Sequence, residues 1–430
     1  MLVQTILVMI SLFFSIHAEV STNGVGPTTF DPQLTMNNQG DALIAWNTGG
    51  NNIGGSIQYA IYDKELKTFG SAITVPGVTV SSQHVAVTSN NRGDALVIWD
   101  TVLGAIQYAI YDKSTKTLRS AQTILETGAF SITPCIAIND EGDAIAVWYN
   151  AQMNIQYSVY HKISKNFEAA KTLLNTTTSV KPQIVINNQG AAILLWYDIV
   201  KEVICYSIYD KTTKFGSTQT ILNTKGAVNQ MVTLNNDTES IIVWNTGSET
   251  TLSGLIQYSV YNKDTKSFGS VKTLPSVKDN LAQNSVPQVT LNDKGLALLT
   301  WCRVAADGKD PLWYALYNKS SNQFETPKAV AGATPYSTAP QLAINDKGDA
   351  VITWFTTMNG TIQYSIYNNS SKVFGPTQAI VGIQSNSEFP VIAFNNQGEG
   401  IVVWSVFNGI QYSSYDKTAK NFSFARNLSK

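Results

Sequence analysis

The chain has 430 residues, of which 10% are aromatic and only 14% charged, and its formal net charge is −1. A nearly neutral chain has no general electrostatic attraction to nucleic acid or to an anionic membrane, so neither is expected as a partner. Its aromatic, Thr and Asn content is typical of strands and turns rather than of amphipathic helices. The composition therefore favours an all-β protein.

The first 18 residues, MLVQTILVMISLFFSIHA, contain no Asp, Glu, Lys or Arg and end in a small residue. This pattern predicts a secretory signal peptide cleaved after Ala18, although the usual Lys or Arg at its start is missing. A single membrane anchor is the alternative, but the apolar run of about 15 residues is shorter than the roughly 20 that span a bilayer. We expect a secreted protein, extracellular or periplasmic, without stable membrane insertion.

A recurring tryptophan divides residues 19–430 into eight units. The landmark residues are Trp46, Trp99, Trp148, Trp196, Trp244, Trp301, Trp354 and Trp404, spaced 48 to 57 residues apart. A period near 50 is typical of propeller repeats, in which each unit is one supersecondary element that cannot bury its faces alone.

Each unit contains four strand-like segments. The first alternates large apolar and small residues, as in QLTM (33–36), and the second is continuously apolar, as in ALIAW (42–46). A continuous apolar run predicts a strand that is covered on both faces. The third and fourth segments, as in IQYAIYD (57–63) and FGSAITV (69–75), complete a blade. The sequence therefore predicts a single domain, an eight-bladed β-propeller with four antiparallel strands per blade, closed by packing of the last blade on the first.

Two short hairpins recur in each unit and are expected on one face of the ring. Between the first and second strands, Asn-Asn-x-Gly suits a type I turn closed by Gly in the left-handed region. The fifth unit has Thr238 at the Gly place, where we expect backbone strain. Between the third and fourth strands, as in YDKELKTF (62–69), Asp or Asn followed by Lys is typical turn chemistry.

Over nearly all of residues 19–430, this pattern resembles secreted bacterial proteins built from tandem propeller repeats. The shared motif is Asn-x-x-Gly-x-Ala, an apolar run, Trp and a Tyr-Asp hairpin, as in NNQGDALIAW (37–46) followed by YD (62–63). The resemblance implies the propeller fold and a mostly non-enzymatic module, in some cases a lectin or adhesin. The unit does not resemble WD or kelch repeats, or the aspartate box of sialidases.

The connections on the opposite face vary in length. The loop after the Trp runs from 5 residues (SVFNG) to 11 (NTGSETTLSGL), and variable loops on a rigid scaffold are where binding is expected. We predict ligand contacts from residues that follow the Trp or lie in these loops: Asn47, Asp100, Tyr149, Tyr197, Asp198, Asn245, Arg303, Asp307, Trp313 and Phe355. Trp313 replaces a Gln found in six other units, where we expect the Gln to satisfy backbone groups. It could stack on a sugar or anchor a protein, or it could fill space between blades.

No catalytic constellation stands out. Of four arginines only Arg303 is expected on the loop face, which excludes the arginine cluster of a sialidase. His84 and His161 have no sequence partner at metal-ligand or triad spacing. The remaining enzymatic alternative is a glycosidase-like pair drawn from three loop carboxylates, Asp100, Asp198 and Asp307. No metal or other cofactor is predicted, and the three cysteines, too few for a disulfide framework, are expected as buried small hydrophobes: Cys135, Cys205 and Cys302.

These patterns predict a monomeric, exported binding scaffold that is carbohydrate-binding or adhesive and takes a glycan or protein ligand at the variable-loop face. A protein-interaction scaffold is the first alternative and a glycan-cleaving hydrolase the second. Repeated shallow sites would give multivalent sugar binding.

Overall fold

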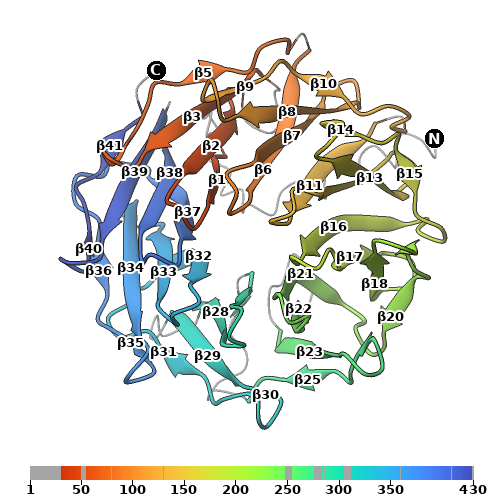
Figure 1. The fold of residues 1–430 in the computed structure, drawn as a ribbon. Helices are drawn as coiled ribbons and strands as arrows, with labels where there is room; N and C mark the ends of the chain where they lie inside the picture. The colour runs from red at the N-terminus through yellow and green to blue at the C-terminus, as the bar shows by residue number, and fades with distance from the viewer. Residues whose placement is uncertain are drawn as a thin grey trace, which may run out of the picture.

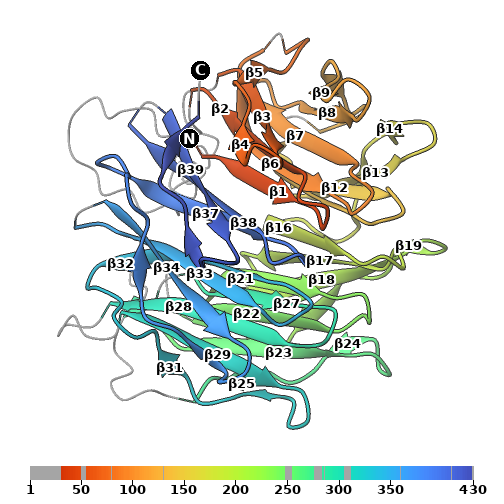
Figure 2. The ribbon, with the colours of Figure 1, turned by 60° about the vertical axis from the view of Figure 1, so that its left-hand side comes forward.

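The computed structural model describes residues 31–49, 55–78, 80–128, 130–246, 254–275, 283–284, 286–304, 311–358, 360–407 and 409–428. Within these ranges the regular secondary structure is β-strand, and the strands form eight antiparallel sheets around a central axis (Figures 1 and 2). The predicted all-β, eight-bladed propeller is confirmed. The predicted signal peptide, residues 1–18, lies outside the described residues.

Every blade is made of strands that are consecutive in the chain. In the first four blades the strands are β1 (Gln33–Met36), β2 (Ala42–Asn47), β3 (Ile57–Asp63), β4 (Thr68–Phe69) and β5 (Ile73–Thr74); β6 (Ser82–Ser89), β7 (Ala95–Thr101), β8 (Ile106–Asp112), β9 (Thr117–Leu118) and β10 (Gln122–Thr123); β11 (Ile132–Ile138), β12 (Ala144–Tyr149), β13 (Ile155–His161), β14 (Asn166–Phe167) and β15 (Lys171–Thr172); β16 (Ser179–Ile186), β17 (Ala192–Asp198), β18 (Val203–Asp210), β19 (Lys214–Phe215) and β20 (Gln219–Ile221).

In the last four blades they are β21 (Ala227–Leu234), β22 (Ser240–Thr246), β23 (Ile256–Asn262), β24 (Ser267–Phe268) and β25 (Lys272–Thr273); β26 (Gln283–Asn284), β27 (Gln288–Leu291), β28 (Ala297–Val304), β29 (Leu312–Asn318), β30 (Gln323–Phe324) and β31 (Lys328–Ala329); β32 (Ser337–Ile344), β33 (Ala350–Thr356), β34 (Thr361–Asn368), β35 (Val373–Phe374) and β36 (Gln378–Ala379); β37 (Glu388–Phe394), β38 (Gly400–Val406), β39 (Gly409–Asp416), β40 (Asn421–Phe422) and β41 (Arg426–Asn427).

The fourth strand of each blade is divided into two short pieces that pair with the same third strand. In the first blade, β4 pairs with the end of β3 through Tyr62 and Asp63, and β5 pairs with its start through Gln58 and Tyr59. Such a short, interrupted outer strand leaves little continuous backbone edge for another strand to join.

The second strand of each blade is buried on both faces, as its apolar sequence predicts. Every residue of β2 is buried, and so is every residue of β7. Eight hydrophobic clusters result, one at each seam between neighbouring blades, and each contains one of the eight repeated tryptophans. None of these tryptophans is more than 4% exposed. The repeated tryptophans therefore pack as large side chains between neighbouring blades.

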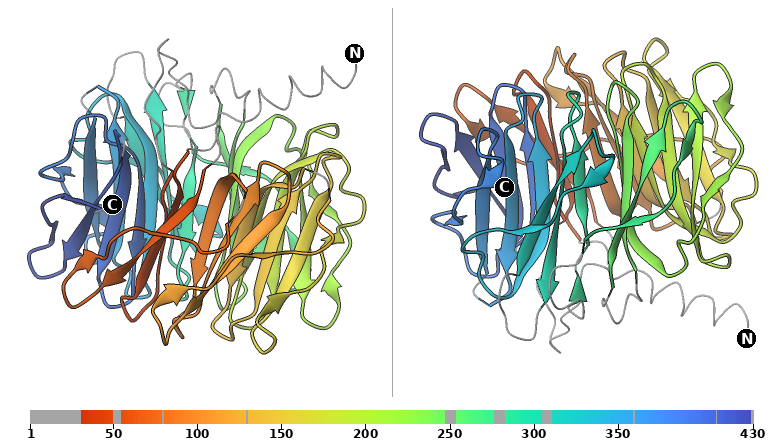
Figure 3. Two further views of the ribbon diagram at one scale, coloured as in Figure 1. Left: turned by 90° about the horizontal axis from the view of Figure 1, so that it is seen from above. Right: turned by 90° about the horizontal axis from the view of Figure 1, so that it is seen from below.

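The two faces of the ring are built from different connections (Figure 3). We call the first-to-second-strand turns the inner turns, at 37–41, 90–94, 139–143, 187–191, 235–239, 292–296, 345–349 and 395–399. The outer turns join the third strand to the fourth, at 63–68, 112–117, 161–166, 210–214, 262–267, 318–323, 368–373 and 416–421. Both sets lie on one face, the hairpin face, because Lys64 of an outer turn donates to the carbonyl of Gln39 in an inner turn at 3.1 Å. The remaining connections form the loop face.

The inner turns have the backbone conformation that their sequence predicts. Gly40 closes the first with φ +82°, in the left-handed region. Thr238, which replaces Gly in the fifth blade, is held at φ +60°, a strained conformation for a β-branched residue. Its hydroxyl accepts a hydrogen bond from the amide of Asn187 in the preceding blade at 3.1 Å, and this contact partly offsets the strain.

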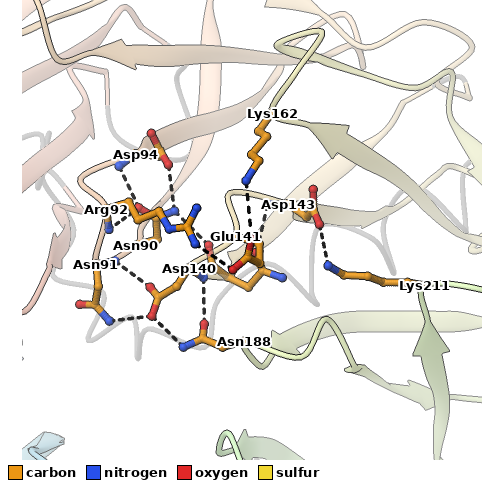
Figure 4. Close-up of polar contacts among 11 residues, drawn as sticks. Asn90, Asn91, Arg92, Asp94, Asp140, Glu141, Asp143, Lys162, Asn188 and Lys211 are labelled. Carbon is orange, nitrogen blue, oxygen red and sulfur yellow. Dashed lines mark hydrogen bonds and ion pairs between the residues drawn. The ribbon is translucent and has the colours of Figure 1, made fainter.

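A closed ring of hydrogen bonds joins the inner turns of all eight blades. The second residue of each turn donates its backbone N–H to the side-chain oxygen of the equivalent residue in the next blade, over 2.7 to 2.9 Å. The last bond, from Asn396 to Asn38, connects the eighth blade to the first. The residues of this ring are Asn38, Asn91, Asp140, Asn188, Asn236, Asp293, Asp346 and Asn396. Part of the ring is drawn in Figure 4.

Two further sets of contacts cross the seams. The first Asn of each inner turn is buried, and in the seventh blade Asn345 accepts from two N–H groups of its own turn and donates to the carbonyl of Asn395. Farther out, the hydroxyl of Tyr412 accepts from the backbone N–H of Phe69 at 3.3 Å. The last blade therefore closes on the first through side chains, without exchange of a strand among the described residues, as the sequence predicts.

Candidate functional site

The second strand continues past the Trp in several blades, and this places most of the predicted contact residues below the surface. Asn47 is the last residue of β2 and is 1% exposed. Its amide donates to the carbonyls of Ser82 and Gln83 in the next blade, the latter at 3.1 Å. Asn47 therefore holds a seam together and presents almost no surface to a ligand.

Asp100 forms a pair with His84 at the loop-face end of the second blade. His84 Nδ1 lies 3.0 Å from one carboxylate oxygen of Asp100 and 3.2 Å from the other. The Asp100 side chain is fully buried, whereas that of His84 is 20% exposed. Sequence spacing did not indicate this partner for His84, because it does not show which residues of adjacent strands β6 and β7 meet.

The environment of this pair shifts the pKa of both groups. Burial raises the pKa of Asp100, and the hydrogen bond from His84 opposes that shift. Burial of His84 favours its neutral form, but the hydrogen bond and charge of Asp100, with a smaller contribution from Asp31, raise its pKa above the ordinary value. The result is an imidazole that is held by a buried carboxylate and partly open to solvent.

Asp198 is also engaged rather than available. It is 1% exposed, and its carboxylate accepts from the hydroxyl of Thr178 at 2.9 Å and from Lys201 Nζ at 2.8 Å. Burial acts to raise the pKa of Asp198, but the hydrogen bonds and charge of Lys201 outweigh it and lower that pKa. Asp100 and Asp198 are thus buried in separate structural contacts, which argues against a glycosidase pair made from them. Asp307 lies outside the described residues.

The other predicted contact residues contribute mainly to packing. Asn245 is 1% exposed and Phe355 is 4% exposed, with the Phe355 ring centred 5.3 Å from that of Phe389. Tyr149 and Tyr197 are half-buried and pack against the hydrophobic clusters of adjacent seams. Arg303 is half-buried in β28, where it pairs with Asn284 of β26. The structure does not bring these residues together into one pocket.

Trp313 fills space between blades. It is 9% exposed, lies opposite Trp301 in the pairing of β28 with β29, and belongs to the cluster at the seam between the fifth and sixth blades. In four other blades the Gln at this place accepts from the indole N–H of the repeated Trp, as Gln156 does from Trp148 at 2.9 Å. The expectation that these Gln side chains satisfy backbone groups was therefore incomplete. Two tryptophans replace that polar pair in the sixth blade.

The loop face carries exposed apolar side chains that the sequence reasoning missed. Four in the loops after the repeated Trp are Leu103, Val200, Met358 and Phe407, which are 55–78% exposed. Phe130 and Tyr336 lie just before the first strands of the third and seventh blades, β11 and β32, and are 63% and 61% exposed. Among the described turns of the hairpin face, by contrast, the exposed large apolar side chains are Leu66, Ile163 and, at 38% exposure, Val373. Exposed large apolar side chains are therefore more numerous in the described connections of the loop face than in the described turns of the hairpin face.

Within the described residues, no group of three or more His, Cys, Asp and Glu side chains is arranged to hold a metal ion. His161 pairs with Glu168 at 2.7 Å on the outside of the third blade. Cys205 and Cys302 are buried, and Cys135 is half-buried with its thiol against the carbonyl of Pro182. No helix in the described part of the chain is long and apolar enough to cross a membrane.

No protein-family model matches the chain, and no curated protein sequence matches it. Solved structures with the same fold do. The Dos1 propeller aligns with a TM-score of 0.59 at 10% identity over 94% of this chain and 95% of that one. Sqt1 of Saccharomyces cerevisiae aligns with a TM-score of 0.57 at 11% identity, over 94% of this chain and 97% of that one. The dihydro-heme d1 dehydrogenase NirN, in complex with DHE, gives 0.56 at 10% identity over 90% of this chain and 73% of that one. At such low identity these similarities show the fold alone.

Proposed function

We propose that this protein is a binding scaffold that takes a protein partner at its loop face. The observation that carries the proposal is the unequal distribution of exposed apolar side chains between the two faces. Leu103, Val200 and Met358 are each more than 70% exposed in loops of three different blades. Aliphatic side chains of this size gain free energy when another protein covers them, at roughly 25 cal/mol per Å² of apolar surface buried.

A carbohydrate ligand is the second candidate, and the observation that favours it is the exposure of Phe130 and Tyr336 on the same face. An exposed ring can stack on the apolar side of a sugar. We place it second because Trp313, the aromatic residue predicted to anchor a sugar, is in the core. Export also stays a proposal, because it depends on residues 1–18.

The test compares two surface variants of the purified protein as baits. The loop-face variant carries Leu103→Ser, Met358→Ser and Phe407→Ser, and the matched control carries Leu66→Ser and Ile163→Ser on the hairpin face. All five side chains are more than half exposed, so both variants should keep the stability of the parent.

We expect protein partners, identified by mass spectrometry, to be retained by the parent and the control and lost from the loop-face variant. A parallel glycan array distinguishes the second candidate. A glycan signal that disappears only in the loop-face variant, without protein partners, would replace the protein assignment by the carbohydrate one. Partners retained equally by both variants would contradict the proposed use of the loop face.

A further inference from the structure

The charged residues of the hairpin face form two concentric groups of opposite sign. The inner turns contain eleven acidic and three basic residues, a net charge of −8. The outer turns contain fourteen lysines and six acidic residues, a net charge of +8. These two groups of charges cancel, so the net charge of the chain is close to zero. The hairpin face nevertheless has a basic circumference around an acidic centre.

The first lysine of an outer turn reaches inward to the acidic centre. Figure 4 shows two of these contacts, in which Lys162 Nζ lies 3.7 Å from a carboxylate oxygen of Glu141 and Lys211 Nζ lies 2.9 Å from one of Asp143. Lys113 makes the same kind of contact with Asp94 at 2.8 Å. These lysines are thus partly neutralised by the inner turns.

The second lysine of the outer turn behaves differently. It occupies a left-handed backbone position, with φ between 50° and 64° in the seven blades where it is present, and Asn322 takes this place in the sixth blade with φ 54°. A non-Gly, non-Asn residue in this region is strained by the order of 1 kcal/mol. Five members of this set are exposed and make no ion pair with another described residue: Lys116, Lys165, Lys266, Lys372 and Lys420.

We propose that these outer-turn lysines bind a linear anionic polysaccharide, bearing repeated sulfate or carboxylate groups, along the circumference of the hairpin face. A thread-like polyanion can follow the lysines and avoid the acidic inner turns. A flat anionic membrane would cover the inner turns as well and meet their net charge of −8. This site is separate from the loop face.

A single-stranded nucleic acid fits the same lysines less well. Its binding by proteins combines basic grooves with aromatic side chains on which the bases stack. The large apolar side chains exposed in the described outer turns are Leu66, Ile163 and Val373, and none is aromatic. The outer turns therefore offer charge without stacking, which is the chemistry of a polysaccharide site.

The test measures binding of the purified protein to heparin, as a sulfated probe, and to polygalacturonate, as a carboxylated probe, across a salt series. The rim variant carries Lys116→Asn, Lys165→Asn and Lys420→Asn, because Asn322 shows that Asn is accommodated at this place. The control carries Lys171→Gln, Lys225→Gln and Lys328→Gln, which remove the same charge from exposed positions outside the outer turns.

We expect the rim variant to lose about tenfold or more in affinity at low salt, and the slope of log affinity against log salt to fall by about 2 to 3, since each released counterion contributes slightly less than one unit. The control should change affinity by less than about twofold. Which of the two polysaccharides binds more tightly identifies the anionic group. Equal losses in both variants, absence of binding to both polysaccharides, or tighter binding of single-stranded DNA or anionic vesicles would overturn the proposal.

Discussion

The hairpin face repeats one arrangement eight times, whereas the loops after the repeated Trp, on the loop face, differ in length and sequence from blade to blade. On the hairpin face every inner turn has the inner turn of the next blade as its hydrogen-bonding partner, and the contacts close into a ring at Asn396 and Asn38. A turn in such a ring cannot change without disturbing both neighbours. Surface loops such as those after the Trp tolerate changes in length and side chain more readily. The fold thus separates closure of the ring from the surface available for recognition.

Trp313→Ala is expected to have the largest effect on stability. Trp313 is among the contacts predicted for the loop face, but the structure places it in the core at a seam between blades. Because this residue is buried, truncating its side chain should lower the unfolding free energy by about 3 to 5 kcal/mol. Phe407→Ala, which removes a ring that is 55% exposed on the loop face, should cost less than about 0.5 kcal/mol. Urea unfolding monitored by far-UV circular dichroism measures both. Unchanged stability of Trp313→Ala would return this residue to the set of binding candidates.

Asn345→Ala tests the hydrogen bonds of an inner turn and should have the second-largest effect on the unfolding free energy. It removes an acceptor for the N–H groups of Lys347 and Asp349, and it removes the bond to the carbonyl of Asn395. Leaving buried backbone groups without partners should cost about 2 to 4 kcal/mol.

The matched control for this prediction is Asn369→Ala in an outer turn of the same blade. Asn369 is exposed and donates to the carbonyl of Lys347 at 3.1 Å, so its loss should cost less than about 0.5 kcal/mol. Equal effects of the two substitutions in urea unfolding would show that the buried Asn of an inner turn stabilises the hairpin face no more than its surface does.

The features that could be predicted from sequence are those that repeat within a blade. Gly40 and its equivalents mark a turn that one hairpin makes by itself, and the continuous apolar run marks a strand that neighbours cover on both sides. The ring through Asn38 could not be predicted, because it joins residues about 50 positions apart that meet only after the blades have closed. In the sequence, its members look like ordinary turn residues.

The predicted contact residues failed for a related reason. Asn47 and Asp100 follow a Trp that was taken as the end of a strand, but β2 ends at Asn47 and β7 continues to Thr101. Residues assigned to loops were therefore strand residues facing a seam. The exposed side chains Leu103 and Met358 lie two residues beyond the ends of β7 and β33, which are at Thr101 and Thr356. A strand end set two residues later would have identified them.

The loop face should also respond to pH through His84. Because the pKa of His84 is raised in the folded protein above its ordinary 6.5, the folded state binds more protons between the two values. The stabilisation of the folded state by protonated His84 is therefore fully present below about pH 6.5 and is lost as the pH rises through the raised pKa. The raised pKa of Asp100 also makes the folded state less stable as the pH rises, but this loss begins at a lower pH, near the ordinary pKa of 3.8. These effects should be smaller than those of Trp313→Ala.

Unfolding free energies of the parent and of His84→Gln, measured from pH 6 to pH 9, test this link. The parent should lose stability relative to the variant as the pH rises, and the difference should level off once His84 is neutral in both states. A difference that stays constant across this range would mean that the His84 and Asp100 pair does not change its proton with folding.

The smallest expected effect is a gain. Lys165→Gly in an outer turn should raise the unfolding free energy by about 0.5 to 1 kcal/mol, because Gly adopts φ near 54° without the strain that Lys incurs. Asn322→Gly at the equivalent place should gain less, since Asn tolerates the left-handed region. If Lys165→Gly is stabilising, the seven lysines are kept against the stability of the fold, which supports a role in binding at the circumference. If it is destabilising, the lysine stems contribute to packing, and the hairpin face would then be structural from its centre to its edge.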